Sequence, residues 1–126
     1  MSMSYRSPHY VLERHGSGHR LVRTAESFDT VEVLAAEHEA LLPHLSKARP
    51  QPLLVDLRDA RGRNDPAFET AMARYRRPMY EGFPRVVVLV RSAIGKLQVQ
   101  RHFAEDGLGD VVVTTSEDEA EQALRR

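Results

Sequence analysis

Two short aliphatic runs in the middle of the chain place the strongest limit on its fold. Residues 53–55 are Leu-Leu-Val and residues 86–90 are Val-Val-Val-Leu-Val, and the second run shows no alternation of apolar and polar residues. A strand of this composition is covered on both faces, which is typical of the centre of a parallel sheet. A third run, Val-Val-Val at 111–113, lies near the C-terminus. These runs predict an α/β protein.

Segments with helical spacing separate the aliphatic runs. From Val31 onward, apolar side chains recur at the +3, +4, +10, +11 and +14 positions, with His38 at +7, which is the spacing of one helical face. Asp29 or Ser27 is expected to cap this helix, and Pro43 to kink or shorten it. Pro66 suits the first turn of a second helix, which Asp65 would cap. This second helix is expected at about 66–81. Two further helices are expected at about 94–105 and, after a Ser116 cap, at 117–124.

The N-terminal part of the chain predicts a β-hairpin. Residues 10–14 and 20–24 are β-prone and flank the glycine-containing segment 15–19, His-Gly-Ser-Gly-His. Residues 1–9 are expected to form a flexible segment. We therefore predict one α/β domain over residues 10–126. Its single-layer sheet would have four or five strands, a hairpin followed by parallel strand–helix units, with about four helices.

Composition excludes several classes of protein. The absence of cysteine excludes disulfides, thiolate metal sites and cysteine nucleophiles. The longest aliphatic run has five residues, whereas a membrane span needs roughly 20, so we expect a cytoplasmic protein without membrane contact. A net charge of zero argues against nucleic-acid binding. Residues 58–85 hold seven arginines against four acids, and residues 104–126 hold seven acids against two arginines. Such blocks indicate solvated faces or complementary contact between chains.

Sequence motifs for cofactors and metals are incomplete. Gly16 and Gly18 lack the third glycine and the following helix of a dinucleotide-binding turn, and Gly95-Lys96 lacks the rest of a phosphate-binding loop. The six histidines form no helical +3 or +4 pair and have no acidic partner at ligand spacing. We therefore expect neither a cofactor nor a metal.

Asp56, which directly follows an aliphatic run, resembles the phosphoacceptor of a receiver domain. Such a domain also needs an acidic pair after its first strand and a lysine after its last, and both are absent here. A degenerate receiver-like domain is one alternative. Another is a small enzyme that uses Asp56, Asp65 or a histidine as general acid or base. No set of nucleophile, base and orienting residue is visible, so we expect a protein that is not an enzyme.

The order of elements over residues 10–126 resembles another family. A hairpin, a helix, the strand–loop–helix segment 53–68 (LLVDLRDARGRNDPAF), the 85–90 strand, a helix and the closing segment 106–124 (DGLGDVVVTTSEDEAEQAL) are similar to the STAS domain of sulphate transporters and anti-sigma-factor antagonists. The SpoIIAA-like bacterial branch is the closer likeness. The resemblance implies a regulatory or ligand-sensing module that binds a partner and catalyses nothing.

One departure from that family concerns its phosphorylation site. Antagonists of this type carry Asp-Ser-Ser-Gly at the head of the helix after the third strand, and these positions fall on residues 64–67, Asn-Asp-Pro-Ala. No hydroxyl-bearing residue lies between Asp59 and Glu69. The usual kinase-dependent switch is therefore not expected. Asp65 would act as a helix cap or would imitate a permanent phosphate.

The loops that follow consecutive parallel strands meet at one end of a sheet, where ligands usually bind in such folds. Two helix N-termini are also expected there, and their free N–H groups favour anions. We predict a site for a small anionic ligand or an acidic protein partner. Its candidate residues are Arg58, Arg61, Arg63, Asn64, Asp65, Arg91, Ser92 and Lys96.

The segment 94–103 is apolar on two sides, with Ile94 and Leu97 on one and Val99 and Phe103 on the other. Such a helix is sunk in the core or contacts another chain. We favour the second interpretation and predict a homodimer contact through Val99, His102 and Phe103.

Overall fold

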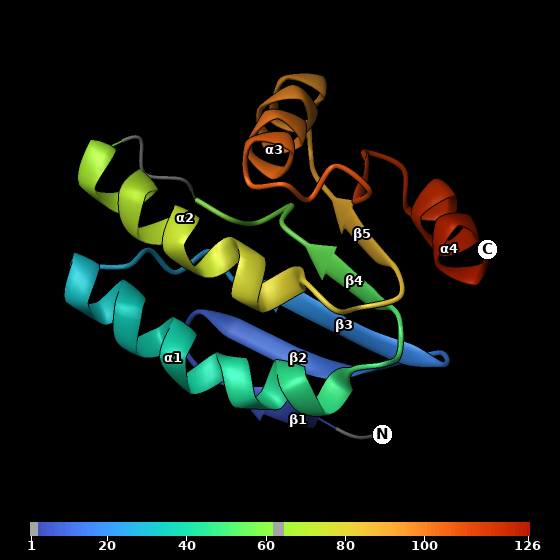
Figure 1. The fold of residues 1–126 in the computed structure, drawn as a ribbon, viewed down its shortest axis with the longest axis horizontal. Coiled ribbons are helices and arrows are strands. Elements are labelled where there is room, and N and C mark those ends of the chain that lie inside the picture. Colours follow the sequence, from blue (N-terminus) through green and yellow to red (C-terminus); the bar gives the residue numbers. More distant parts are fainter. Residues whose placement is uncertain (1–2, 62–64) are drawn as a thin grey trace.

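The computed structural model describes residues 3–61 and 65–126 and has the α/β architecture expected from the sequence (Figure 1). One mixed sheet has the strand order β1-β2-β3-β4-β5-β6. β1, β2 and β3 are antiparallel, and β3, β4, β5 and β6 are parallel. The strands are β1 (Met3–Arg6), β2 (Tyr10–His15), β3 (Gly18–Arg23), β4 (Leu53–Asp56), β5 (Val86–Leu89) and β6 (Val112–Thr114). The predicted hairpin and parallel strand–helix units are confirmed.

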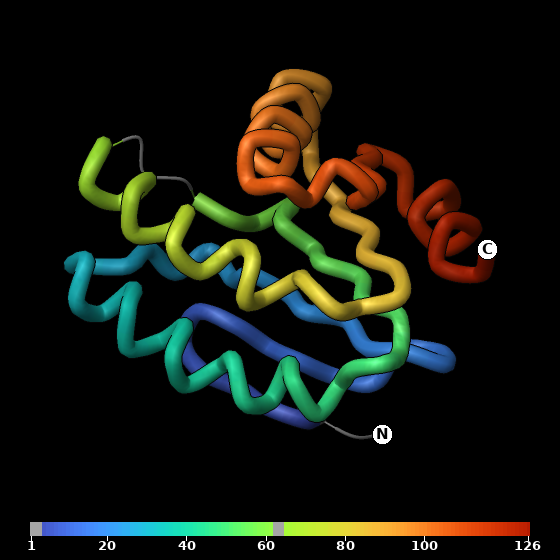
Figure 2. Tube along the Cα trace, viewed as in Figure 1, coloured from blue at the N-terminus to red at the C-terminus, as the bar shows by residue number. Residues whose placement is uncertain are grey.

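In the described part of the chain, four helices cover the sheet, three on one face and one on the other. They are α1 (Val31–Ala48), α2 (Pro66–Tyr80), α3 (Ala93–Glu105) and α4 (Glu117–Arg125). α1 and α2 run side by side and, with Phe103 of α3, share one large core with the sheet (Figure 2). α4 packs on β4, β5 and β6 from the opposite face, through a smaller core. None of the described helices has the length and apolar composition to cross a membrane.

Alternation along the central strands explains why their sequences are continuously apolar. Leu53 and Val55 of β4 belong to the large core, whereas Leu54 belongs to the small core with Ala120 and Ala123 of α4. β5 divides its valines in the same way. Because both faces of these strands are covered, no position except Asp56 at the end of β4 accepts a charge.

The prediction of four or five strands was wrong, since the described residues form a sheet of six. Residues 3–6, which lie in the segment predicted to be flexible, pair antiparallel with β2, and Tyr5 lies opposite Leu12. Tyr5 also packs against the core and against the ring of His44, with 4.4 Å between ring centroids. Packing of this one aromatic side chain fixes an edge strand that has little β-propensity elsewhere.

Helix ends differ from the sequence prediction in three places. Thr30, not Ser27 or Asp29, caps α1, and its side chain accepts a hydrogen bond from the Val33 N–H at 3.1 Å. Pro43 does not shorten α1; it lies on the exposed side, where water can satisfy the carbonyl that loses its donor. Asp65 occupies the cap position of α2 without the side-chain cap bond, although Pro66 begins the helix as predicted. Ser116 caps α4 as predicted, accepting from the Glu119 N–H.

Candidate functional site

A cavity of about 210 Å³ lies between α1, α2 and α3, at the carboxyl ends of β3 and β4. Ligands usually bind at this end of the strands in open α/β sheets. Most of its wall is apolar or aromatic: Tyr10, Phe28, Leu34, Leu57, Ala60, Phe68, Met72, Tyr80, Val99 and Phe103. The remaining lining residues are Arg23, Arg61, Glu69, Arg76 and His102. An apolar wall with a few polar groups is typical of a site for a small molecule.

Arg23 is a buried cation in this wall, with 6% of its surface exposed. It follows Leu21 on the inward side of β3, and its guanidinium lies 4.3 Å from the ring centre of Phe28. Nη1 donates to the carbonyl oxygens of Thr24 and Glu26 at 2.8 and 2.7 Å. Burial lowers the pKa of Arg23, and the field of nearby groups, including Glu37, partly offsets this. No carboxylate in the described chain forms an ion pair with Arg23.

Arg76, by contrast, has its charge balanced inside the protein. Its Nη2 donates to Glu69 Oε1 at 2.6 Å, and its Nε donates to Asp106. Burial opposes the charged form, but the two carboxylates outweigh it and raise the pKa of Arg76. Glu69 also lies 3.4 Å from Nδ1 of His102. This group of charges links α2 to α3 and forms one side of the cavity.

Tyr10, which lines the cavity, forms a buried hydrogen-bonded pair with His38, which does not. His38 Nδ1 lies 2.8 Å from the Leu34 carbonyl oxygen, which can only accept, so Nδ1 carries the proton. His38 Nε2 therefore accepts from the Tyr10 hydroxyl at 2.6 Å. Burial lowers the pKa of His38 and raises that of Tyr10, so both groups are neutral near pH 7. Both ring nitrogens of His38 are hydrogen-bonded, and the pair holds α1 against β2.

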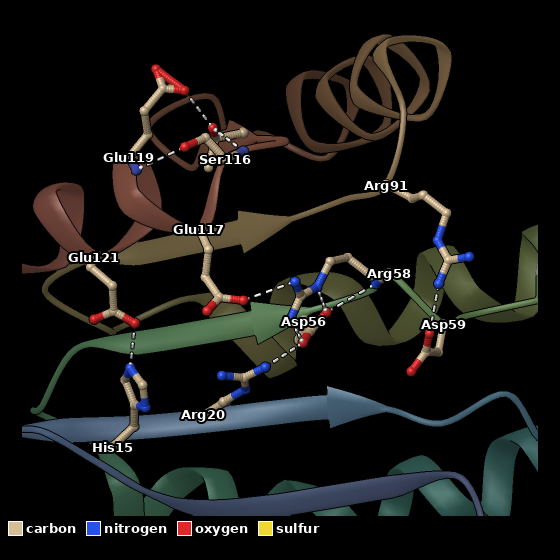
Figure 3. A network of polar contacts seen from close by, with 11 residues as sticks. His15, Arg20, Asp56, Arg58, Asp59, Arg91, Ser116, Glu117, Glu119 and Glu121 are labelled. Carbon is tan, nitrogen blue, oxygen red and sulfur yellow. Dashed lines mark hydrogen bonds and ion pairs between the residues drawn. The ribbon is translucent and has the colours of Figure 1, made fainter.

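Asp56 and Arg58 belong to a polar network on the α4 face of the sheet, away from the cavity (Figure 3). Asp56 Oδ2 accepts from Arg20 at 2.5 Å and from Arg58 at 2.8 Å, and Arg58 also reaches Glu117 of α4 at 2.8 Å. Burial raises the pKa of the Asp56 carboxyl, but hydrogen bonds from Arg58 and Arg20 prevail and hold it at about 2. Asp56 is thus ionised near pH 7, a state that suits a structural counter-ion better than a general acid.

The remaining residues predicted to bind an anion are spread over the surface. Arg91 pairs with Asp59 at 2.7 Å on the exposed loops (Figure 3). The Ser92 side chain caps α3. Lys96 is half-buried on α3, and Asp65 is exposed at the start of α2. Arg61 lines the cavity. Arg63 and Asn64 lie outside the described residues. Among the described candidates, then, Arg61 alone lines the cavity, because the chain after β4 sends Arg58 to the other face of the sheet.

One apolar side of α3 packs inside the protein, and the other is exposed to solvent. Val99, His102 and Phe103, our candidates for a dimer contact, line the cavity, and Phe103 is only 4% exposed because it packs on Tyr80. The chain's own core therefore occupies the side that we had assigned to a partner. Ile94 and Leu97 on the other side are 71% and 68% exposed.

Sequence reasoning missed most of the cavity, including Arg23 and Arg76. For Arg23 a signal was present: in β3 it takes the position after Leu21 in the alternation, where an inward side chain is expected. For Arg76 the partners are 7 and 30 residues away along the chain, which leaves no local pattern to detect.

No group of three or more potential metal ligands occurs within residues 3–61 and 65–126. Comparison of the chain with protein-family models, with curated proteins and with solved structures finds no match. The chemistry of the cavity is therefore the firmest guide to function.

Proposed function

We propose that this protein is a non-enzymatic binding module, of the regulatory kind found in the STAS and SpoIIAA-like proteins that its sequence resembles, and that it binds a small ligand in the cavity between α1, α2 and α3. The single observation that carries this proposal is the cavity itself. Its wall is mainly apolar and aromatic and contains few polar groups, as ligand sites generally do.

Three features favour binding over catalysis. Asp56, the strongest acid–base candidate in the sequence, is ionised and held by two arginines. The Tyr10–His38 pair is neutral, and both of its hydrogen-bonding ends are engaged. Arg76 and Glu69 neutralise each other at the cavity wall. These particular groups are thereby engaged in holding the fold.

The size of the cavity limits the ligand. A volume of about 210 Å³ is below the range of about 300–1,000 Å³ that drug-sized ligands occupy. A protein cavity of about 150 Å³ is large enough for benzene. The ligand should therefore be about one ring, or a short branched chain, with a small polar group.

Filling the cavity is expected to abolish binding of a neutral aromatic probe. Benzyl alcohol should produce saturable NMR shifts at residues such as Phe68 and Met72 in the wild type. Val99→Trp places an indole in the cavity and should weaken binding by at least about tenfold, because the space is taken. Gln98→Trp, on the exposed side of the same helix, is the matched control and should bind normally. Equal binding by both variants would contradict the proposal, as would absence of binding by benzyl alcohol together with the two probes described in the next subsection.

The exposed side of α3 favours a second function, contact between two copies of the chain. Ile94 and Leu97 are large apolar side chains open to solvent, three residues apart on the same helix, and exposed apolar side chains that lie together are typical of protein interfaces. Light scattering should give a dimer mass for the wild type. Leu97→Glu should shift the mass to that of a monomer while the circular dichroism spectrum stays unchanged, since Leu97 is not among the described core residues. A monomer mass for the wild type at high concentration rules this contact out.

A further inference from the structure

The cavity wall contains more positively charged than negatively charged side chains. Three arginines and one glutamate contribute to the wall. Arg76 is balanced by Glu69 and Asp106. No carboxylate of the described residues forms an ion pair with Arg23 or with Arg61. Glu37 and Glu26 act on Arg23 only from beyond ion-pair distance, and a buried cation without a close counter-ion is costly, so this part of the wall favours an anion.

The hydrogen bonds of Arg23 indicate where that anion would sit. Every bond that the described residues make with its guanidinium uses Nη1, toward carbonyl oxygens of His9, Thr24 and Glu26. The Nε–H and the Nη2–H groups form the other edge of the planar group, and that edge has the spacing of two carboxylate oxygens. The Phe28 ring lies under the guanidinium and restricts its movement.

We propose that the ligand is a small monocarboxylic acid with an apolar or aromatic body, and that Arg23 binds its carboxylate. This inference rests on the proposed function and names the ligand class of the same cavity. The carboxylate would pair with the free edge of Arg23, and the body would pack against aromatic lining residues such as Phe28 and Phe68. Arg61, which is exposed, would attract the acid from solution without being buried with it.

Size and charge together favour a carboxylate over a phosphate ester. One buried guanidinium without a direct ion-pair partner balances at most a single negative charge, whereas a phosphate monoester brings up to two. A phosphoryl group would also place more acceptor oxygens against a wall that is mostly apolar. A carboxylate needs only the two donors that the edge of Arg23 provides.

The test compares two probes of nearly equal shape, phenylacetate and its neutral amide, phenylacetamide, by calorimetry and NMR. The wild type should bind phenylacetate at least about tenfold more tightly, and the Arg23 Nε–H resonance should shift with the acid alone. In Arg23→Gln the preference should disappear while the amide still binds. Arg77→Gln, an exposed arginine paired with Glu81, is the control and should keep the preference.

The possible outcomes separate the two proposals. Equal affinity for acid and amide would overturn the carboxylate inference and leave the cavity as a binding site. Absence of binding by either probe, with benzyl alcohol also inactive, would overturn both. If Arg23→Gln does not fold, the wild-type comparison and the Arg23 Nε–H resonance decide: a preferred acid that leaves this resonance unmoved excludes Arg23 as its partner.

Discussion

Replacing Gly18 by alanine is expected to destabilise the protein by about 3 kcal/mol or more. Gly18 begins β3 at the point where this strand meets the segment before β4. A Cβ atom at this position would lie 2.2 Å from the carbonyl oxygen of Pro52 and 3.0 Å from its carbonyl carbon. The same oxygen accepts a hydrogen bond from the His19 N–H at 3.0 Å. Relief of the clash therefore requires movement of backbone in the centre of the sheet, and not of a flexible side chain.

Chemical denaturation followed by circular dichroism measures this effect. Gly109→Ala is a matched control, because a Cβ there meets no atom within 4 Å and its φ angle is not positive. The control should change the free energy of unfolding by less than about 0.5 kcal/mol. A Gly18→Ala variant as stable as the Gly109→Ala variant would show that β3 and β4 do not approach each other as described.

Replacing Asp56 by asparagine is expected to cost about 3 kcal/mol at neutral pH. The Asp56 side chain is 7% exposed and is the counter-ion of Arg20 and Arg58. An asparagine of the same shape keeps part of the hydrogen bonding but removes the charge, which leaves two cations side by side at the edge of the small core. Denaturation at neutral pH measures the loss. Asp59→Asn, in an exposed pair with Arg91, should change stability by less than about 0.5 kcal/mol.

The same carboxylate gives the protein a defined sensitivity to acid. The pKa of Asp56 is about 2 in the folded protein, against an ordinary value of 3.8. Its contribution, about 2 kcal/mol, is therefore complete above the unfolded pKa and declines as pH falls from about 4 toward about 2. The Asp56→Asn variant lacks this group, so the stability difference between the two proteins should narrow over that interval. A difference that stays constant down to about pH 2 would contradict the role given to Asp56.

The predictions that were confirmed depend on residues close together in the sequence, within one strand, turn or helix. The runs 53–55 and 86–90 predicted central strands because burial on both faces removes every polar residue from them. The hairpin was predictable because Gly16 adopts a positive φ of 57° in the tight connection between β2 and β3. Ser116 was predictable as a cap because the bond it makes is local to its own helix.

Contacts between distant elements account for the part that could not be predicted. The strand at residues 3–6 depends on Tyr5 meeting His44, about 40 positions later. Arg58 and Arg61 are three residues apart, yet one faces Glu117 and the other lines the cavity, a division set by the path of the loop. For α3, the sequence shows two apolar sides, and only packing against Tyr80 decides that Phe103 is the buried one.

The strand β4 also has a consequence for how this protein tolerates change. Leu53 and Val55 face the layer that contains the cavity, whereas Leu54 and Asp56 face α4. Substitutions around Asp56 are therefore expected to change the free energy of unfolding without changing the shape of the cavity around Arg23. The acid-sensitive network around Asp56 and the layer that contains the cavity therefore lie on opposite faces of one strand, so a substitution on one face leaves the packing on the other in place.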